Sequence, residues 1–465
     1  MNPAAWVHGW RRFALLALAV AAVYTPSLSA SFQLDDWWSI VDNPSVHSLA
    51  AWWQSLPGIR PLLKLSHAMN WSLSPAPWGF RLVNVALHAG NAVLLMALMQ
   101  RWLARLVPTQ AHVAPAALAV ALLFAVHPAA TEAVTYLSGR SITLMATFYL
   151  ASLLALSMSQ ESGHGARWRL LSALLFALAL GVRESAVTLP LAWLLYARCR
   201  GDAWRDALAP LRAHALVLAL AMAAGALTPG YHSFFGWSLQ THDLASQWRG
   251  QLEAHAYLLT GPLPGLRLNI DPDLRVPDAL AVRHVALVTL ALALAALGWR
   301  QRKARPWLAF GLGWYVLQLA PSNSLMPRFD LGNDRHLYLA LVGPAMVLVL
   351  ALVPLPRRAF VLAMTSLLAV LAGATLLRNH DYRSERALWE TTVRQSPAKA
   401  RPWLNLGYAR QLAGDDEGAL AAYRCALARE PGRARDQAAI NLATLAAQRD
   451  IQPVSDGPRA PCLPP

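Results

Sequence analysis

The chain has 465 residues, of which 56% are hydrophobic and only 14% are charged, and it contains 19 tryptophans. This composition excludes an ordinary soluble protein and indicates a polytopic membrane protein with some water-exposed mass. The formal charge of +15 comes mostly from short arginine clusters between apolar segments rather than from one basic face, so nucleic acid is not an expected partner.

Apolar segments long enough to be membrane helices follow one another over the first 380 residues. About eleven are expected, at 13–30, 82–100, 114–127, 137–158, 168–182, 185–198, 212–229, 283–299, 306–321, 336–353 and 358–377. The first resembles both a signal peptide and an anchor, and we favour an uncleaved anchor because the later spans need an orienting first helix. Residues 251–266 are short of a span and end in Gly and Pro, so we expect a re-entrant or interfacial segment there.

The arginine-rich connections predict the orientation of these spans. If all of them are cytoplasmic, the spans alternate strictly. The outer side then holds 31–81, the loops near 128–136, 183–184, 230–282 and 322–335, and everything after about 378. Nucleotide-activated donors are absent from that side, so an activated donor would have to be carried by a lipid. Three lysines against 37 arginines are typical of a GC-rich bacterial genome, which predicts the bacterial inner membrane with a periplasmic C-terminal region.

Two adjacent carboxylates, Asp35 and Asp36, follow the first span and precede Trp37-Trp38. Carboxylates at the outer end of a membrane helix are costly to dehydrate, and tryptophans suit the membrane interface. We interpret the pair as the edge of an active site, where one acid accepts a proton from an attacking hydroxyl and the other orients it or holds a cation. Asp36 is slightly favoured as the base. The alternative is a solvated Asp-Asp turn after a helix.

Further polar residues lie in the outer loops. Arg60 and Lys64 are four residues apart, so on a helix they would present one cationic face to a lipid phosphate; the alternative is ordinary headgroup contact by snorkelling side chains. Charges in an apolar setting should be paired or should line a wet cavity. The candidates of this kind are His127, Glu132, Arg140, Arg183, Glu184, Asp334, Arg335, His336 and Tyr338. For Arg183-Glu184 the alternative is a structural ion pair.

After about residue 377 the apolar runs stop and a helical repeat pattern begins. Seven of the eight signature positions of a 34-residue tetratricopeptide repeat are matched, by Trp403, Leu406, Gly407, Ala419, Tyr423, Ala426 and Pro431, while Arg410 replaces the usual aromatic. We therefore predict a membrane domain at 1–380, a repeat region at 381–450 and a disordered Pro-rich tail at 451–465. So short an array should lean on the membrane domain or on a partner. The three cysteines have no metal-ligand spacing and predict neither a disulfide framework nor a zinc site.

The order of these motifs resembles a known family. The motifs are Phe-x-Leu-Asp-Asp, Arg60-Pro61-Leu62, Asn84 with His88, His127-Pro128 with Glu132, Ser138-Gly139-Arg140, Arg183-Glu184, Pro321-Ser322-Asn323, Asp334-Arg335-His336-Leu337-Tyr338 and the trailing repeat. Together they resemble the transmembrane and tetratricopeptide-repeat protein O-mannosyltransferases of the GT-C glycosyltransferase superfamily, over nearly the whole chain. Arg183 stands where relatives have Lys and Asp334 where a Glu commonly precedes Arg, which keeps charge but alters reach.

This resemblance implies an all-α, GT-C-like membrane enzyme that transfers a sugar from a polyprenyl-phosphate donor to a protein Ser/Thr or a glycan hydroxyl. Asp35 or Asp36 would be the base, and the phosphate-holding cations would come from Arg60, Lys64, Arg140, Arg183 and Arg335. A direct displacement would invert the anomeric centre. No cofactor is certain, and a divalent metal is left open because its ligands cannot be counted.

Two other classes of function compete with an enzyme. A membrane scaffold or assembly factor would recruit partners through the repeat and would tolerate the loss of Asp35, Asp36 or Arg140. A transporter would need polar residues near the middle of its spans, whereas most of those found here lie at span ends.

Overall fold

The computed structural model describes residues 3–107, 109–161, 163–240, 243–261, 268–324, 327–449 and 462. Within these ranges the chain is built of helices and turns without a strand, which confirms the predicted all-α class. The α-helices are α1 (Pro3–Tyr24), α2 (Leu49–Gln54), α3 (Pro61–Leu73), α4 (Pro77–Leu106), α5 (Val113–Val126), α6 (Thr131–Val134), α7 (Arg140–Ser159), α8 (Gly165–Val182), α9 (Leu189–Arg200), α10 (Trp204–Leu208), α11 (Arg212–Leu227), α12 (Pro229–Leu239), α13 (Leu244–Thr260), α14 (Val282–Gln301), α15 (Pro306–Leu319), α16 (Leu337–Ala340), α17 (Val342–Leu352), α18 (Arg357–Asp381), α19 (Glu385–Gln395), α20 (Ala400–Leu412), α21 (Asp416–Leu427) and α22 (Arg433–Gln448). Short helical turns connect them at η1 (Thr25–Ser29), η2 (Trp37–Val41), η3 (Pro44–Val46), η4 (Gln110–His112), η5 (Pro128–Ala130), η6 (Leu137–Gly139), η7 (Glu184–Thr188), η8 (Ala209–Leu211) and η9 (Asp334–His336).

Seven helical stretches of the described chain are long and apolar enough to cross a membrane, and two bent pairs would raise the number to nine. The predicted count of eleven is therefore not confirmed. Two of the predicted spans correspond to α9 and α15, which have only 12 and 14 residues. The bent pairs are Gln110–Val126 with Pro128–Val134, at 56°, and Asp334–Ala340 with Val342–Leu352, at 52°. At the first bend Pro128 removes a backbone donor, so the helix cannot continue straight through His127.

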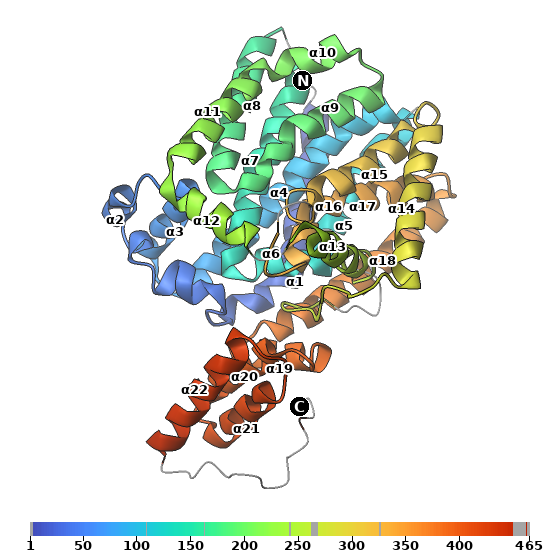
Figure 1. Ribbon diagram of the computed structural model, residues 1–465. Coiled ribbons are helices and arrows are strands. Elements are labelled where there is room, and N and C mark those ends of the chain that lie inside the picture. Colours follow the sequence, from blue (N-terminus) through green and yellow to red (C-terminus); the bar gives the residue numbers. More distant parts are fainter. Residues whose placement is uncertain are drawn as a thin grey trace.

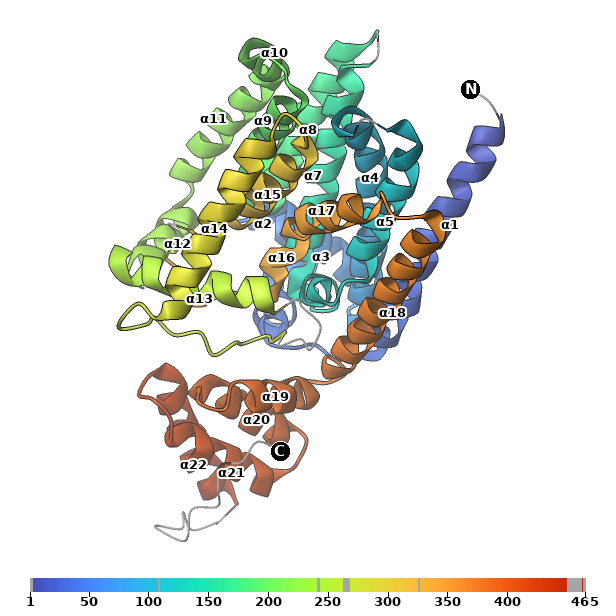
Figure 2. The same cartoon turned by 90° about the vertical axis from the view of Figure 1, so that its right-hand side faces the viewer.

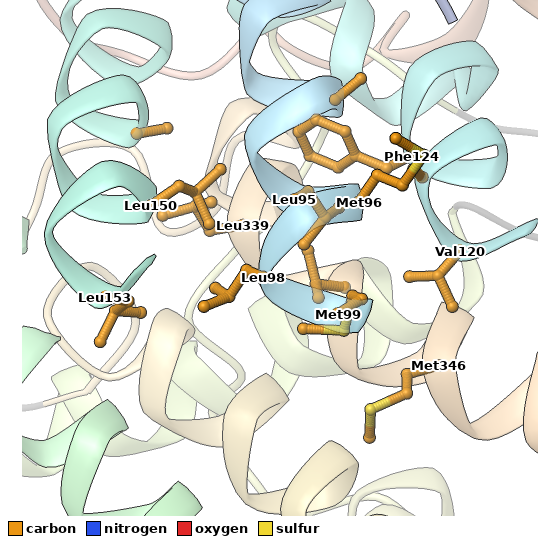
Figure 3. Packing of buried hydrophobic residues seen from close by; sticks show 14 of the residues in the cluster. Leu95, Met96, Leu98, Met99, Val120, Phe124, Leu150, Leu153, Leu339 and Met346 are labelled. Carbon is orange, nitrogen blue, oxygen red and sulfur yellow. The ribbon is translucent and has the colours of Figure 1, made fainter. Parts of the chain in front are cut away.

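The apolar core of the membrane domain surrounds α4. Side chains of α4 point toward α5 on one side and α7 on the other, and α17 closes the cluster (Figure 3). The labelled residues of this core are Leu95, Met96, Leu98, Met99, Val120, Phe124, Leu150, Leu153, Leu339 and Met346. Helix α1 also packs here, because Leu16 and Val20 are fully buried in the same cluster. The core thus fixes the helices whose ends carry the polar loops.

The two ends of the bundle differ in what they carry. Helix α10 lies at one end, and helices α19–α22 lie at the opposite end (Figures 1 and 2). Helix α13 runs across the end that faces α19–α22 (Figure 2), and it is not among the candidate spans, as expected for the part of 251–266 that it covers. Residues 262–266 of that segment lie outside the described residues. The loops with the predicted site residues meet at this same end.

Helices α19–α22, which we call the repeat region, pack around a buried aromatic core. Trp403 is 3% exposed and Tyr423 is fully buried. A Cβ atom at Gly407 would lie 2.5 Å from the ring of Tyr423, so only glycine allows this close approach of α20 and α21. Arg410, in place of an aromatic residue, donates to the carbonyl oxygen of Gly418 at 3.2 Å.

The repeat region is docked on the outer loops of the membrane domain. Arg401 donates to Asp330 at 2.7 Å and to Oδ2 of Asp271 at 2.6 Å. Asn269 donates to the hydroxyl of Ser396 at 2.8 Å. The short array thus leans on the membrane domain, as the sequence predicts.

The cysteine prediction was wrong. Cys425 of α21 forms a disulfide with Cys462, and their Cα atoms are 5.5 Å apart. The two residues are separated by 37 positions, so spacing alone did not reveal the pairing. The rest of the predicted disordered tail lies outside the described residues.

Candidate functional site

Asp36 ties the turn after the first helix to the start of α7. Its carboxylate is fully buried and accepts hydrogen bonds from the backbone N–H and the hydroxyl of Ser138, both at 2.8 Å, and from the N–H of Gln33 at 3.0 Å. Burial raises the pKa of Asp36 to about 7, although the hydrogen bonds from Ser138 and Gln33 and the charge of Arg81 oppose this rise. All of these hydrogen bonds are to other parts of the protein, so they stabilise the fold.

Asp35 is presented differently from its neighbour. It is exposed, and within the described chain its carboxylate forms no hydrogen bond, while its backbone N–H donates to the hydroxyl of Tyr136 at 2.9 Å. The preceding Leu34 has φ of +50°, a left-handed conformation that is strained for a leucine. The charge of Asp35 acts on Arg335 and on Tyr136. In this turn the carboxylate of Asp36 is therefore buried, and that of Asp35 is exposed.

Arg60 is neutralised by Glu184. Its guanidinium donates to both carboxylate oxygens of Glu184, at 2.7–3.1 Å, and the hydroxyl of Tyr231 donates to the same carboxylate at 3.2 Å. Burial alone would raise the pKa of Glu184, but Arg60 outweighs it and lowers this pKa to about 2. The alternative of an Arg183-Glu184 ion pair is not what the structure has: Glu184 pairs with Arg60, which leaves Arg183 without that partner.

The side chain of Arg183 is buried and that of Arg328 is partly buried, and neither guanidinium has a carboxylate within ion-pair distance among the described residues. Arg183 donates to the hydroxyl of Ser141 at 2.8 Å, and Nη1 of Arg328 lies 3.5 Å from Nε2 of His336. Burial lowers the pKa of Arg183 well below its ordinary value, and the like charges of Arg60, Arg328 and Arg335 lower it further. Burial and the charges of Arg335 and Arg60 likewise lower the pKa of Arg328 to about 10. Two guanidinium groups close enough to repel each other, without a carboxylate in ion-pair distance, are a candidate site for an anion.

Arg335 lies near enough to Arg183, Arg328 and Asp35 for their charges to interact, and it is paired with Glu132. Its backbone N–H donates to Glu132 at 3.0 Å, and its guanidinium Nε lies 3.5 Å from the same carboxylate. The neighbouring Asp334 accepts a hydrogen bond from Tyr257 at 2.6 Å and lies 3.7 Å from Arg378. Glu132 is therefore paired with Arg335, 203 residues away, rather than with the nearby Arg140.

The guanidinium of Arg140, predicted to hold the donor phosphate, is occupied by contacts within the protein, and the structure gives that role no support. The side chain is fully buried and donates to the side-chain oxygens of Asn84 and Asn70, at 2.7 and 2.8 Å, and to the backbone oxygens of Phe80 and Ser66. With no exposed surface, the guanidinium braces α7 against α3 and α4. Lys64 is half-buried in α3, away from these contacts, and stays a prediction.

Two other predicted site residues, His127 and Tyr338, have mainly structural contacts. His127 accepts a hydrogen bond from the N–H of Ala129 and caps η5. The hydroxyl of Tyr338 lies 2.8 Å from Nδ1 of His88 and accepts from Asn91 at 3.1 Å, inside the core. His336, by contrast, faces the cationic pair through Arg328.

A narrow cavity of about 30 Å³ is lined by Arg183 and Arg335 but not by Arg328. Its other lining residues are Ser185, Gln318, Ser322, His336, Ile142, Met145, Tyr338 and Leu339, so cationic, polar and apolar side chains meet around it. Because ligand pockets are typically about 300–1,000 Å³, this space is too small in the present structure to hold a lipid phosphate.

The sequence interpretation missed Arg328, Tyr136 and Glu385. Arg328 belongs to no motif and lies seven residues before Arg335, so only its unusual charge in an outer loop would have signalled it. Tyr136 lies two residues before Ser138, inside a segment already singled out. No cluster of three or more His, Cys, Asp or Glu side chains that could hold a metal ion occurs in the part of the chain that the structure describes.

Comparison with known proteins supports the family resemblance. The chain is 32% identical over 207 residues to the protein O-mannosyl-transferase TMTC4 of Homo sapiens, a match that covers 38% of this chain and 28% of that protein. It is 30% identical over 280 residues to protein O-mannosyl-transferase Tmtc2 of Drosophila melanogaster, a match that covers 54% of this chain and 28% of that protein. The match to TMTC3 of Mus musculus is 29% over 197 residues, covering 38% and 20%. The chain thus covers only 20–28% of the length of these relatives. No family model and no solved structure matches it.

Proposed function

We propose that this protein is a membrane glycosyltransferase that moves a sugar, mannose on the example of its relatives' names, from a polyprenyl-phosphate carrier to a protein hydroxyl. The observation that carries the proposal is the pair of guanidinium groups of Arg183, which is buried, and Arg328, which is partly buried, neither of them ion-paired with a carboxylate among the described residues. Arg335 lies near enough to both, and to the exposed Asp35, for their charges to interact. The guanidinium groups would bind the donor phosphate, and Asp35 would be the base.

Asp35 is better placed than Asp36 to act as the base. The carboxylate of Asp36 is fully buried and already accepts three hydrogen bonds, whereas that of Asp35 is exposed and free to accept a proton. In the reaction, the acceptor oxygen would form a bond to the anomeric carbon while its proton passes to Asp35. The bond between the anomeric carbon and the phosphate oxygen would break, releasing polyprenyl phosphate and inverting the anomeric centre.

The charge of the cationic pair fits the leaving group better than the intact donor. The phosphodiester of the donor carries one negative charge, whereas the released phosphate monoester carries about −1.5 to −2 near pH 7. Arg60 and Arg335 are each paired with a glutamate, so Arg183 and Arg328 supply the unbalanced positive charges. An interaction that strengthens as the phosphate charge grows lowers the barrier rather than only tightening donor binding.

We place the reaction on the outer side of the membrane. Helix α10, in an arginine-rich connection, lies at the end of the bundle opposite the repeat region, as the positive-inside rule expects for a cytoplasmic end. The Cys425–Cys462 disulfide in the repeat region is compatible with an oxidising compartment. The bacterial inner membrane stays a prediction from the low ratio of lysine to arginine in the sequence.

Alkaline-phosphatase fusions after Leu377 and after Arg200 test the orientation. The first fusion should be active, because it would lie outside the cytoplasm, and the second should be silent.

The direct test supplies purified protein with a polyprenyl-phosphate mannose and a Ser/Thr-rich peptide. Transfer should be seen with the native protein and should be lost with Asp35→Asn. A non-catalytic scaffold would leave the peptide unmodified by both proteins, and its partner binding would be the same with and without Asp35→Asn.

A further inference from the structure

The Leu34-Asp35 turn is held from below by the first helix of the repeat region. Oε1 of Glu385, the first residue of α19, accepts a hydrogen bond from the backbone N–H of Leu34 at 3.3 Å. One residue earlier, the buried amide of Gln33 donates to the backbone oxygen of Tyr382 at 2.5 Å. Two consecutive residues next to Asp35 are thus bonded to the junction between α18 and α19.

The side chain of Leu34 joins the same contact. It packs against the apolar core of the repeat region, while its backbone is in the left-handed conformation. Such a conformation persists only where surrounding contacts enforce it. Here the enforcing contacts are the leucine side chain in the repeat core and the N–H bond to Glu385.

The position of Glu385 is not explained by its place at the start of α19. An acidic residue in the first turn of a helix is ordinarily explained by the helix dipole, and the cap of α19 is already supplied by Ser384, which accepts from the N–H of Ala387. The carboxylate of Glu385 instead faces the Asp35 turn, with the indole rings of Trp37 and Trp389 beside it. The N–H groups of these two rings are buried and form no hydrogen bond of normal geometry among the described residues.

We propose that Glu385 is a positioning residue for Asp35, and that α19 is therefore a structural part of the reaction site rather than only a support for partner binding. This inference rests on the proposed function in that Asp35 is the base. If Leu34 relaxes from its left-handed conformation, the Leu34-Asp35 peptide rotates and the Asp35 carboxylate turns away from Arg335. Because a displacement of about 1 Å can cost about 10²-fold in rate, the contact affects turnover without touching the substrate.

The kinetic test compares Glu385→Ala with Glu390→Ala in the full-length protein in lipid nanodiscs. Glu390 lies on the same helix and is paired with Arg386 at 2.9 Å, away from the turn, so it controls for any general weakening of α19. With polyprenyl-phosphate mannose as donor, Glu385→Ala should lower kcat about 10–100-fold and leave the KM for the donor within about twofold. Glu390→Ala should change neither. Equal kcat values for Glu385→Ala and Glu390→Ala would overturn the proposal.

Two conservative variants separate position from charge. Glu385→Gln keeps the length and one oxygen acceptor for the N–H of Leu34, whereas Glu385→Asp keeps the charge and is one methylene too short. Positioning predicts that Gln retains more activity than Asp, and the opposite order would show that charge matters instead. These variants also decide the question if the alanine variant does not fold.

Hydrogen exchange provides a readout that does not depend on catalysis. The backbone amide hydrogen of Leu34 should exchange with solvent about tenfold faster in Glu385→Ala than in the native protein. Its exchange rate should be unchanged in Glu390→Ala. Unaltered exchange in Glu385→Ala would refute the contact. If the native protein transfers no sugar but the exchange result holds, the proposed function fails while the link between α19 and the turn stands.

Discussion

The arginines at the repeat-facing end of the bundle fall into two groups that differ in how they are satisfied. Arg140 and Arg81 are fully buried, and neutral oxygens of loops and helices accept their hydrogen bonds. Arg183 is also buried and Arg328 is partly buried, but both lie near other cations and have no ion-pair partner in the described chain. Under the proposed function, the first group stabilises the architecture and the second group binds the donor phosphate. Burial alone therefore does not identify a site, whereas a guanidinium group without a carboxylate partner makes a candidate.

The same contrast separates the two adjacent aspartates and leads to the largest expected effect. Asp35→Asn keeps the size of the side chain and removes its basicity, so turnover should fall by about 10²–10⁴ with unchanged protein abundance. Asp36→Asn should lose far less activity, because the buried Asp36 is about half protonated near pH 7 and asparagine resembles that form. Steady-state transfer assays on both variants measure the difference. Equal losses would show that the two acids act as one unit.

The second prediction is that substitutions in the first arginine group lower stability, whereas those in the second group lower activity. Arg140→Ala leaves the buried oxygens of Asn70 and Asn84 without their donor, and should cost about 3–5 kcal/mol in the free energy of unfolding. Arg183→Ala or Arg328→Ala removes a repelled charge, so thermal stability should not fall, while kcat should drop about 10–100-fold. Melting temperature and kcat measured on the same preparations test both halves. A large stability loss in Arg183→Ala would place it with the architectural group.

Much of the architecture could be predicted because it is written in local patterns. Apolar runs predicted the helices, and arginine clusters between them predicted which loops share a side. The partners of the charged residues could not be predicted in this way. Glu132 meets Arg335 from 203 positions away, and Arg60 meets Glu184 from 124 positions away, because helix packing and not sequence proximity brings them together. The choice between Asp35 and Asp36 also depended on packing, since only the fold shows which one is buried.

The third prediction tests whether the repeat region belongs to the site or only to its surroundings. Trp403→Ala or Tyr423→Ala removes a buried ring and should cost about 3–5 kcal/mol in the stability of the repeat region. Deleting residues 385–465 should lower transfer to a peptide more than donor binding. Binding of a fluorescent polyprenyl phosphate and peptide transfer can be measured in parallel. Normal transfer by the truncated protein would make the repeat region an accessory.

The smallest expected effect concerns the pH dependence that Asp36 contributes to stability. Its pKa is about 7 in the folded protein and near 3.8 when the chain is unfolded, so the folded state binds this proton more tightly. The resulting stabilisation is fully present below about pH 4 and is lost as the pH rises through 7. Asp36→Asn cannot titrate, so its melting temperature should change less between pH 5 and pH 8 than that of the native protein. Because other groups titrate identically in both, the difference between the two slopes isolates Asp36. Parallel slopes would mean that Asp36 is not buried as an acid, and would weaken the argument that leaves Asp35 as the base.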